Sequence, residues 1–315
     1  MRFVPALAAA VVVALLPFGL SGYHQGLAAY VAVYFIAILG LNILTGYTGQ
    51  ISIGHGAFMA IGGYVTVLMS SRHHTNLIAT LPLSCAIAFG CGVLVGIPAL
   101  RLSGVYLALA TFALAVSVPQ LPLKFSTFLG GSNGIHTDHT VTHLWLYGVS
   151  WGCAAIVFVL AWLLLRGRVG RAFRAVRDSE VAAASSGVSL PIYKTLAFGV
   201  SAAFAGVAGS LFVLATNGFA QPNEFGVLLS LKILIGAAVA GLGSLRGVLV
   251  GALFVGLLPQ ISESVPLVGA AHGQDVVFGL VVILVMLLLP NGFVGLVGNV
   301  ERLFKTAIKP DPKTS

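Results

Sequence analysis

The chain has 315 residues, of which 58% are hydrophobic and only 8% are charged. Soluble domains carry about a quarter charged residues, so this composition excludes a soluble protein and predicts one polytopic membrane domain over residues 1–315. The formal net charge of +8 would suggest nucleic acid in a soluble protein. Basic cytoplasmic loops explain it here, and we expect no nucleic-acid partner.

Ten apolar stretches are candidate membrane spans, since a helix needs about 20 apolar residues to cross a bilayer. They cover residues 3–20, 27–45, 57–69, 77–100, 105–121, 146–165, 192–215, 227–242, 248–261 and 276–289. The first stretch could be a signal peptide, but only Arg2 precedes it and no small-residue cleavage site follows. The sequence therefore predicts an all-α transmembrane helix bundle of about ten spans, with the first helix retained.

The distribution of basic residues favours one orientation of this bundle in the lipid bilayer. With ten crossings and the amino terminus inside, the outer side receives only Arg72 and Lys124 among the lysines and arginines. Basic loops face the cytoplasm, so both termini are expected there. A break within residues 46–55 that does not cross would change this count. We expect the basic, proline-rich tail of residues 301–315 to be mobile.

The densest basic cluster lies in the loop of residues 166–191, between the sixth and seventh spans. Residues 171–186 favour a short helix, with Arg174 and Asp178 spaced to pair on its surface and Gly187 placed to end it. The apolar residues of this helix do not form a wide stripe, so we expect it not to be deeply buried. Docking into a groove on a soluble partner would suit such a helix. A solvated basic anchor is the alternative.

The segment of residues 46–56 is the second candidate site. Its four glycines interrupt the helical pattern between the second and third spans. Broken helices that face a cavity form polar sites in carriers, where amides at a helix amino end can meet an anionic group. A zwitterionic amino acid would fit there, and a cytoplasmic turn is the alternative. The candidate residues of a substrate pathway are Thr48, Gly49, Gln50, Ser52 and His55.

The energy source is expected on another protein. The chain has no G-x-x-x-x-G-K-[S/T] loop for ATP phosphates. Its carboxylates fall in loops or at span ends, whereas ion-coupled carriers usually place them within the spans. Lys232 lies inside the eighth span and must face a cavity or a partner, or extend to the interface. The three cysteines have no metal-binding spacing, and we expect no enzyme activity, cofactor or metal. A passive pore is the alternative to a driven transporter.

Five motifs follow one another from about the second span to the tail. They are LTGYTGQISIGHGAFMAIGGY (44–64), LGGSNGI (129–135), GRAFRAVRDSEVAAASSGVSLPIYKTLAFGVSAAFAGVAGSL (170–211), GLGSLRG (241–247) and LPNGFVGL (289–296). In this order they resemble the LivM family, which comprises permease subunits of ATP-binding-cassette (ABC) importers for branched-chain amino acids. The departures from the family pattern are Lys232, Ser185, Ser186, Ser189 and Leu190. Urea and short-chain amide importers use similar permeases.

The resemblance implies a place in the bacterial inner membrane and three kinds of partner. These are a second homologous, LivH-like permease subunit, two cytoplasmic ATPase subunits and a periplasmic substrate-binding protein. The implied function is ATP-driven import of branched-chain or other apolar amino acids by alternating access. An importer of urea or short-chain amides and an ion-coupled secondary amino acid carrier remain alternatives. The residues expected to couple the ATPases to transport are Arg174, Arg177, Asp178, Glu180, Ala183 and Gly187.

Overall fold

A computed structural model of the chain describes residues 21–73, 75–137, 141–263, 279–280, 283–284 and 287. In chain order, its elements are α2 (Gly22–Leu41), the π-helix η2 (Asn42–Tyr47), α3 (His55–His73), α4 (Leu77–Ala99), α5 (Val105–Ser117), the 3₁₀-helix η3 (Val118–Gln120), α6 (Leu121–Lys124), α7 (Ser126–Leu129), η4 (Gly131–Asn133), β1 (Ile135–His136), α8 (His143–Arg166), α9 (Arg168–Asp178), α10 (Glu180–Ser185), α11 (Leu190–Ala215), β2 (Phe219–Ala220), η5 (Pro222–Phe225), α12 (Val227–Ala240) and α13 (Val248–Glu263).

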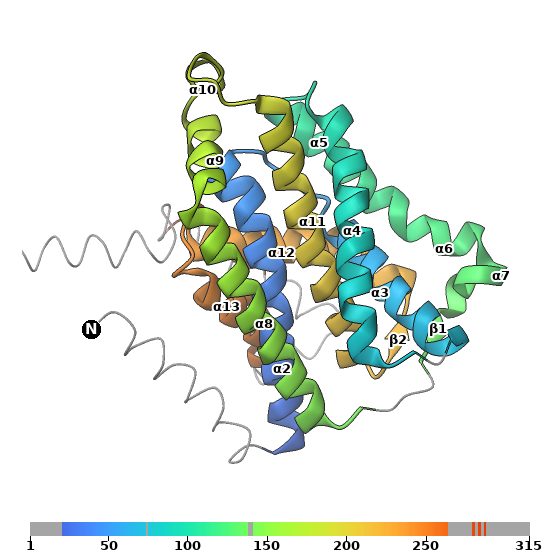
Figure 1. Cartoon of the computed structure of the whole chain (residues 1–315). Helices are drawn as coiled ribbons and strands as arrows, with labels where there is room; N and C mark the ends of the chain where they lie inside the picture. Colours follow the sequence, from blue (N-terminus) through green and yellow to red (C-terminus); the bar gives the residue numbers. More distant parts are fainter. Residues whose placement is uncertain are drawn as a thin grey trace, which may run out of the picture.

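The long helices form a bundle in which α8 packs against α2, and α4 packs against α11 (Figure 1). Helices α9 and α10 lie at one end of this bundle. The strands β1 and β2 lie at the other end and pair antiparallel, with Ile135 opposite Ala220. The two ends are therefore different in kind, one helical and basic, the other built from short strands and turns.

Each predicted span from the second to the ninth coincides with a helix, and the all-α expectation is confirmed. Among the described residues, six helical stretches are long and apolar enough to cross a membrane. They are Gly22–Tyr47, Leu77–Ala99, Val105–Lys124, His143–Arg166, Leu190–Ala215 and Pro222–Ala240. The first predicted span, most of the tenth and the tail of residues 301–315 lie outside the described residues.

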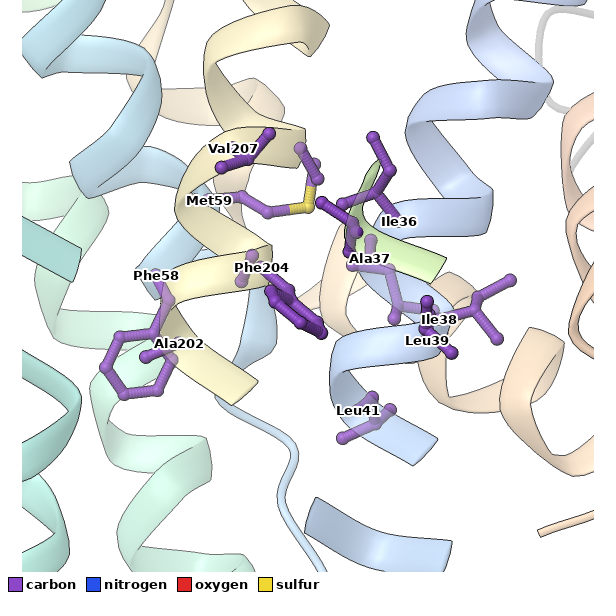
Figure 2. Packing of buried hydrophobic residues seen from close by; sticks show 14 of the residues in the cluster. Ile36, Ala37, Ile38, Leu39, Leu41, Phe58, Met59, Ala202, Phe204 and Val207 are labelled. Carbon is purple, nitrogen blue, oxygen red and sulfur yellow. The ribbon is translucent and has the colours of Figure 1, made fainter. Parts of the chain in front are cut away.

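The core of the bundle is built around α11 and the second half of α2, which are buried along nearly their whole length. Side chains of α2, α3 and α11 meet there, among them Ile36, Met59 and Phe204 (Figure 2). These helices are apolar on every side, as expected for helices surrounded by other helices and not by water. The outer helices, such as α5, instead expose apolar side chains, among them Val105 and Tyr106.

Glycines set how closely α3 and α11 approach. An added Cβ at Gly62 of α3 would collide with the carbonyl oxygen of Gly206, and one at Gly209 of α11 would collide with that of Met59. Small residues at such crossings let helix backbones touch, which strengthens packing where no hydrophobic force acts between helices. The abundance of glycine in the sequence is thus partly a consequence of tight helix crossings.

Candidate functional site

The basic loop forms two helices, which corrects the single helix predicted over residues 171–186. Helix α9 ends at Asp178 and α10 begins at Glu180. Ser179 lies between them in an extended conformation, and its Oγ accepts a hydrogen bond of 3.3 Å from the backbone amide of Ala182. Serine is a favoured helix N-cap because its side chain satisfies a free amide, so Ser179 ends one helix and starts the next.

Gly187 ends α10, as the sequence predicts. The amide of Gly187 donates to the Ala184 carbonyl at 3.0 Å, and that of Val188 donates to the Ala183 carbonyl at 3.0 Å. This is a Schellman motif, which needs a left-handed residue at its turn, and Gly187 has a φ of +81°. A Cβ at Gly187 would meet no atom within 4 Å, and Val181 is 79% exposed. Helix α10 therefore presents open surface.

Helix α9 is buried on one face, and the expectation that the helix of this loop would not be deeply buried was wrong for this part of it. Phe173 and Val176 are both buried. The Phe173 ring meets the ring of Tyr193, at the start of α11, edge to face at 6.4 Å between centroids. Phe173 and Val176 stand three residues apart, so they share a face of the helix. The basic residues take the remaining surface.

An ion pair joins α10 to α11. Lys194 Nζ lies 2.6 Å from Glu180 Oε1. The Lys194 side chain is only 8% exposed, whereas that of Glu180 is 48% exposed. A buried ammonium needs a charged or hydrogen-bonding partner, so Glu180 holds α10 onto the first turns of the central helix.

Arg177 joins α9 to the π-helix η2. Its Nη1 donates to the carbonyl oxygen of Gly46 at 3.0 Å, while its Nε lies 3.3 Å from Asp178 Oδ1. The predicted Arg174–Asp178 pair is thus replaced by a pair between neighbours. Arg174 instead donates to the Leu165 carbonyl at the end of α8, at 3.3 Å. Both arginines therefore bind backbone oxygens near helix ends, where positive charge is favoured.

The π-helix η2 is tied to the turn between α12 and α13 through Asn42. The Asn42 side chain donates to the Ser244 carbonyl at 2.8 Å, and its Oδ1 accepts from the Gly243 amide at 2.7 Å. A Cβ at Gly46 would collide with the Gly243 amide, so these two backbones touch. π-helical turns inside α-helices are frequent at functional sites. Arg177, η2 and this turn form one contiguous cluster.

The polar residues after η2 point into the protein. Thr48, Gln50, Ser52 and His55 are all buried, while Gly49 is exposed and has a φ of +73°. Gln50 Nε2 donates to Thr48 Oγ1 at 2.9 Å, and Thr48 Oγ1 donates to the Leu44 carbonyl at 2.6 Å. Of the sequence-predicted pathway residues, all of which the structure describes, only Thr48 and Gln50 are joined to each other by a hydrogen bond, while Ser52 Oγ accepts from the Gly54 amide and the His55 ring lies against Gly40.

His55 starts α3 inside the bundle. Its ring lies against Gly40 of α2, where an added Cβ would come within 3.2 Å of Nε2. The next amide, that of Gly56, donates to Ser230 Oγ of α12 at 2.9 Å. The chain thus returns from η2 into the bundle before α3 begins, and the amino end of α3 meets α12.

Sequence reasoning missed three residues of this region. In the sequence, Lys194 is only one of the positive charges of the cytoplasmic side. Asn42 falls within an apolar span, and Gly46 is one of the glycines of the break. The sequence did contain a sign that Asn42 has a structural role, because a side-chain amide inside an apolar span needs a hydrogen-bond partner. Nothing in the sequence identifies that partner, since Gly243 lies 201 positions away.

Replacing Asn42 with leucine should destabilise the protein. The variant keeps the side-chain volume but leaves the Gly243 amide and the Ser244 carbonyl without their side-chain partner. Each such loss costs about 1–3 kcal/mol, so we expect the free energy of unfolding in detergent micelles to fall by about 2–4 kcal/mol. Asn133→Leu, at an exposed position, is the control and should be nearly neutral. Equal losses for both variants would contradict this role.

A bundle of long apolar helices, closed at one end by basic helices that bind its core, defines a multi-pass α-helical membrane protein. The chain belongs to a family described as the permease component of branched-chain amino acid transport systems, which it matches over residues 24–287. That description is of a transport component and not of an enzyme.

Relatives with this role support the assignment. The chain is 33% identical over 270 residues to the high-affinity branched-chain amino acid transport system permease protein LivM of Salmonella typhimurium, and 32% identical over 270 residues to LivM of Escherichia coli. Each match covers 76% of this chain and 63% of the relative, so the chain spans less than two thirds of the LivM relatives' length. The permease protein LivH of Escherichia coli is 26% identical over 289 residues, 83% of this chain and 91% of that protein. No solved structure matches the chain.

Proposed function

We propose that this chain is a permease subunit of an ATP-driven importer that moves branched-chain or other apolar amino acids across the bacterial inner membrane by alternating access. The LivM and LivH relatives are named for branched-chain amino acid transport, which favours such a substrate over urea or a short-chain amide. The single domain of residues 1–315 would make about ten crossings, with both termini in the cytoplasm.

The partners in this proposal are a second, homologous permease, two cytoplasmic ATPases and a periplasmic binding protein. The similarity of this chain to both LivM and LivH proteins supports a pair of related permeases. The chain itself carries no phosphate-binding loop of the Walker type, so ATP would be hydrolysed by the partners.

The observation that carries the proposal is the construction of α9 and α10. Their outer surface is open at Val181 and Gly187, while Glu180 and Arg177 attach them to the core. A partner that binds this surface and moves would pull on α11 through Lys194 and on η2 through Gly46. Coupling between sites requires such a contiguous, physically connected element. The residues assigned to coupling are Arg174, Arg177, Asp178, Glu180, Ala183 and Gly187, and Thr48, Gly49, Gln50, Ser52 and His55 remain the proposed pathway.

The test is leucine uptake by proteoliposomes that hold the whole complex. We expect uptake to require ATP and to survive an uncoupler. Gly187→Trp should reduce uptake by about tenfold or more. A loss of about 1.4 kcal/mol in the binding free energy between α10 and its partner already lowers the affinity tenfold. The variant places a large side chain on the open surface of α10.

Gly104→Trp is the matched control. Gly104 also has a positive φ and open space around an added Cβ, but it lies between α4 and α5. Its variant also places tryptophan at a position with a positive φ, and it should keep uptake within about twofold. Strain at such a position costs roughly 1–3 kcal/mol of stability but does not touch the docking surface of α10. Uptake by Gly187→Trp at the wild-type rate, with the ATPases bound, would remove the coupling assignment. Uptake that continues without the ATPases would favour an ion-coupled carrier.

A further inference from the structure

A carboxylate with a free buried oxygen lies in the turn before α12. Glu224 belongs to η5, and in the described structure its Oε2 is buried and has no hydrogen-bond partner. The next residue, Phe225, is fully buried, with its ring against Gly63 of α3, where an added Cβ would lie 2.9 Å from Cζ. The backbone of Glu224 is therefore held firmly, while part of its charge is unsatisfied.

Aromatic rings from three helices surround this turn. The Phe225 ring lies 6.2 Å from that of Tyr64 on α3 and 5.6 Å from that of Phe212 on α11. Phe212 in turn meets Tyr30 of α2 at 6.0 Å between ring centroids. The row of rings therefore runs from α2 to α3 beside Glu224.

A tyrosine hydroxyl lies in the same surroundings as the carboxylate. Tyr64 is 7% exposed, and in the described structure its hydroxyl has no hydrogen-bond partner. The Tyr64 ring meets the ring of Phe225, the residue that directly follows Glu224. Tyr64 and Glu224 thus each offer an unused polar atom within one aromatic surrounding.

The chemistry of this cluster fits an organic cation that donates hydrogen bonds. A buried carboxylate oxygen without a partner is costly, and a primary ammonium group supplies up to three donors. Ring faces also attract cations, and the attraction grows when the cation is removed from water. An anion would be repelled by Glu224, and an uncharged apolar molecule would leave the carboxylate unpaired.

The break of residues 46–56 lies between this cluster and the helices α9 and α10. Tyr64 follows His55 by nine residues, which is about 13 Å of helix, and Tyr30 precedes Gly40 by ten residues on α2. Beyond Gly40, α2 continues into η2, whose Gly46 contacts Arg177 of α9. A molecule crossing from the opposite end would therefore pass Glu224 before it reaches the break.

We infer that Glu224, with Tyr64 and the neighbouring aromatic rings, binds the α-ammonium group of the amino acid during its passage. This inference rests on the proposed function and adds the recognition of the substrate's positive end to it. The carboxylate and the rings select an ammonium-bearing molecule, and the apolar neighbours accept its side chain.

The experiment compares Glu224→Gln with the wild-type chain in the complete complex, reconstituted in proteoliposomes with leucine as the probe. Glu224→Gln keeps the shape and removes the charge, and it should lower the rate of leucine uptake about tenfold or more, because a hydrogen bond to a charged group is lost. Tyr64→Phe should lower it by a smaller factor. Tyr23→Phe, at an exposed tyrosine near the start of α2, is the matched control and should leave uptake unchanged.

Thermal unfolding of the same variants separates binding from structure. Because Glu224 Oε2 has no partner in the described structure, Glu224→Gln should not lower the unfolding temperature, and the ATPases should copurify normally. A lower unfolding temperature together with lost uptake would mean a structural carboxylate and would overturn the inference. So would uptake by Glu224→Gln at the wild-type rate.

Two further outcomes concern the ligand. Replacing external sodium with potassium should leave wild-type uptake unchanged, and a strict need for sodium would assign Glu224 to a metal cation and overturn the ammonium site. Failure of the wild-type complex to import any amino acid would overturn the proposed function and this site with it. A working wild-type complex with an unaffected Glu224→Gln variant would overturn the site alone.

Discussion

Gly209→Ala should destabilise the protein by about 3 kcal/mol, because overpacking a helix crossing costs roughly this much when the backbone has to move. The new Cβ would collide with the carbonyl oxygen of Met59 on α3. A backbone oxygen cannot rotate away as the end of a flexible side chain can, so α3 and α11 must separate. Gly62→Ala, against the Gly206 carbonyl, should have a similar effect.

Unfolding in detergent micelles measures this difference, and the chain offers matched controls. Gly90 of α4 and Gly152 of α8 are helical glycines at which an added Cβ would meet no atom within 4 Å. Gly90→Ala and Gly152→Ala should be neutral or slightly stabilising, since alanine favours a helix over glycine by about 1 kcal/mol. If all four variants unfolded alike, the close approach of α3 and α11 would not hold the bundle together.

Glu180→Ala should reduce ATP-driven uptake strongly and lower the free energy of unfolding by about 2 kcal/mol. The change leaves the Lys194 ammonium buried without its carboxylate. Losing one partner of a buried pair costs about 3–5 kcal/mol, and the 48% exposure of Glu180 lets solvent screen part of that. Uptake should fall further than stability alone explains, because α10 loses its attachment to α11.

A second substitution separates these two effects. In Glu180→Ala/Lys194→Met, the unpaired charge is gone, so stability should return close to the wild-type value while uptake stays low. Asp178→Asn is the control, since its pair with Arg177 is exposed and such pairs contribute about 0–1 kcal/mol. Restored uptake in the double variant would show that the ion pair stabilises α10 but does not transmit force.

The long helices of the described bundle could be predicted from the sequence to within a few residues at each end. Apolar runs long enough to span a bilayer have few alternatives to a helix, because lipid leaves no partner for free backbone groups. The end of α10 at Gly187 was predictable for a local reason as well, since its turn requires a left-handed residue. The break at Ser179 had a local signal too, a serine followed by a glutamate, but the helix-forming alanines around it outweighed that signal.

The buried face of α9 and the partners of its charges depended on distant parts of the chain. Arg177 binds a carbonyl 131 positions away, and Asn42 meets a turn about 200 positions away. Spacing along one helix predicted an Arg174–Asp178 pair because only near neighbours are visible in a sequence. The sequence indicated that residues 46–56 interrupt the helices. It did not show that the polar side chains of this segment form hydrogen bonds inside the protein.

The sequence by itself determined that the protein is a bundle of apolar helices suited to a membrane, which stretches of the described residues are helical, and which loop carries the basic cluster. These properties follow from local composition, because each helix satisfies its own backbone and each span meets lipid or another helix. Only the tertiary structure decided which charges meet, such as Lys194 with Glu180, and which buried polar atoms, such as Glu224 Oε2 and the Tyr64 hydroxyl, have no hydrogen-bond partner among the described residues. Those outcomes depend on how helices cross, and a crossing is set by pairs of surfaces that are far apart in the chain.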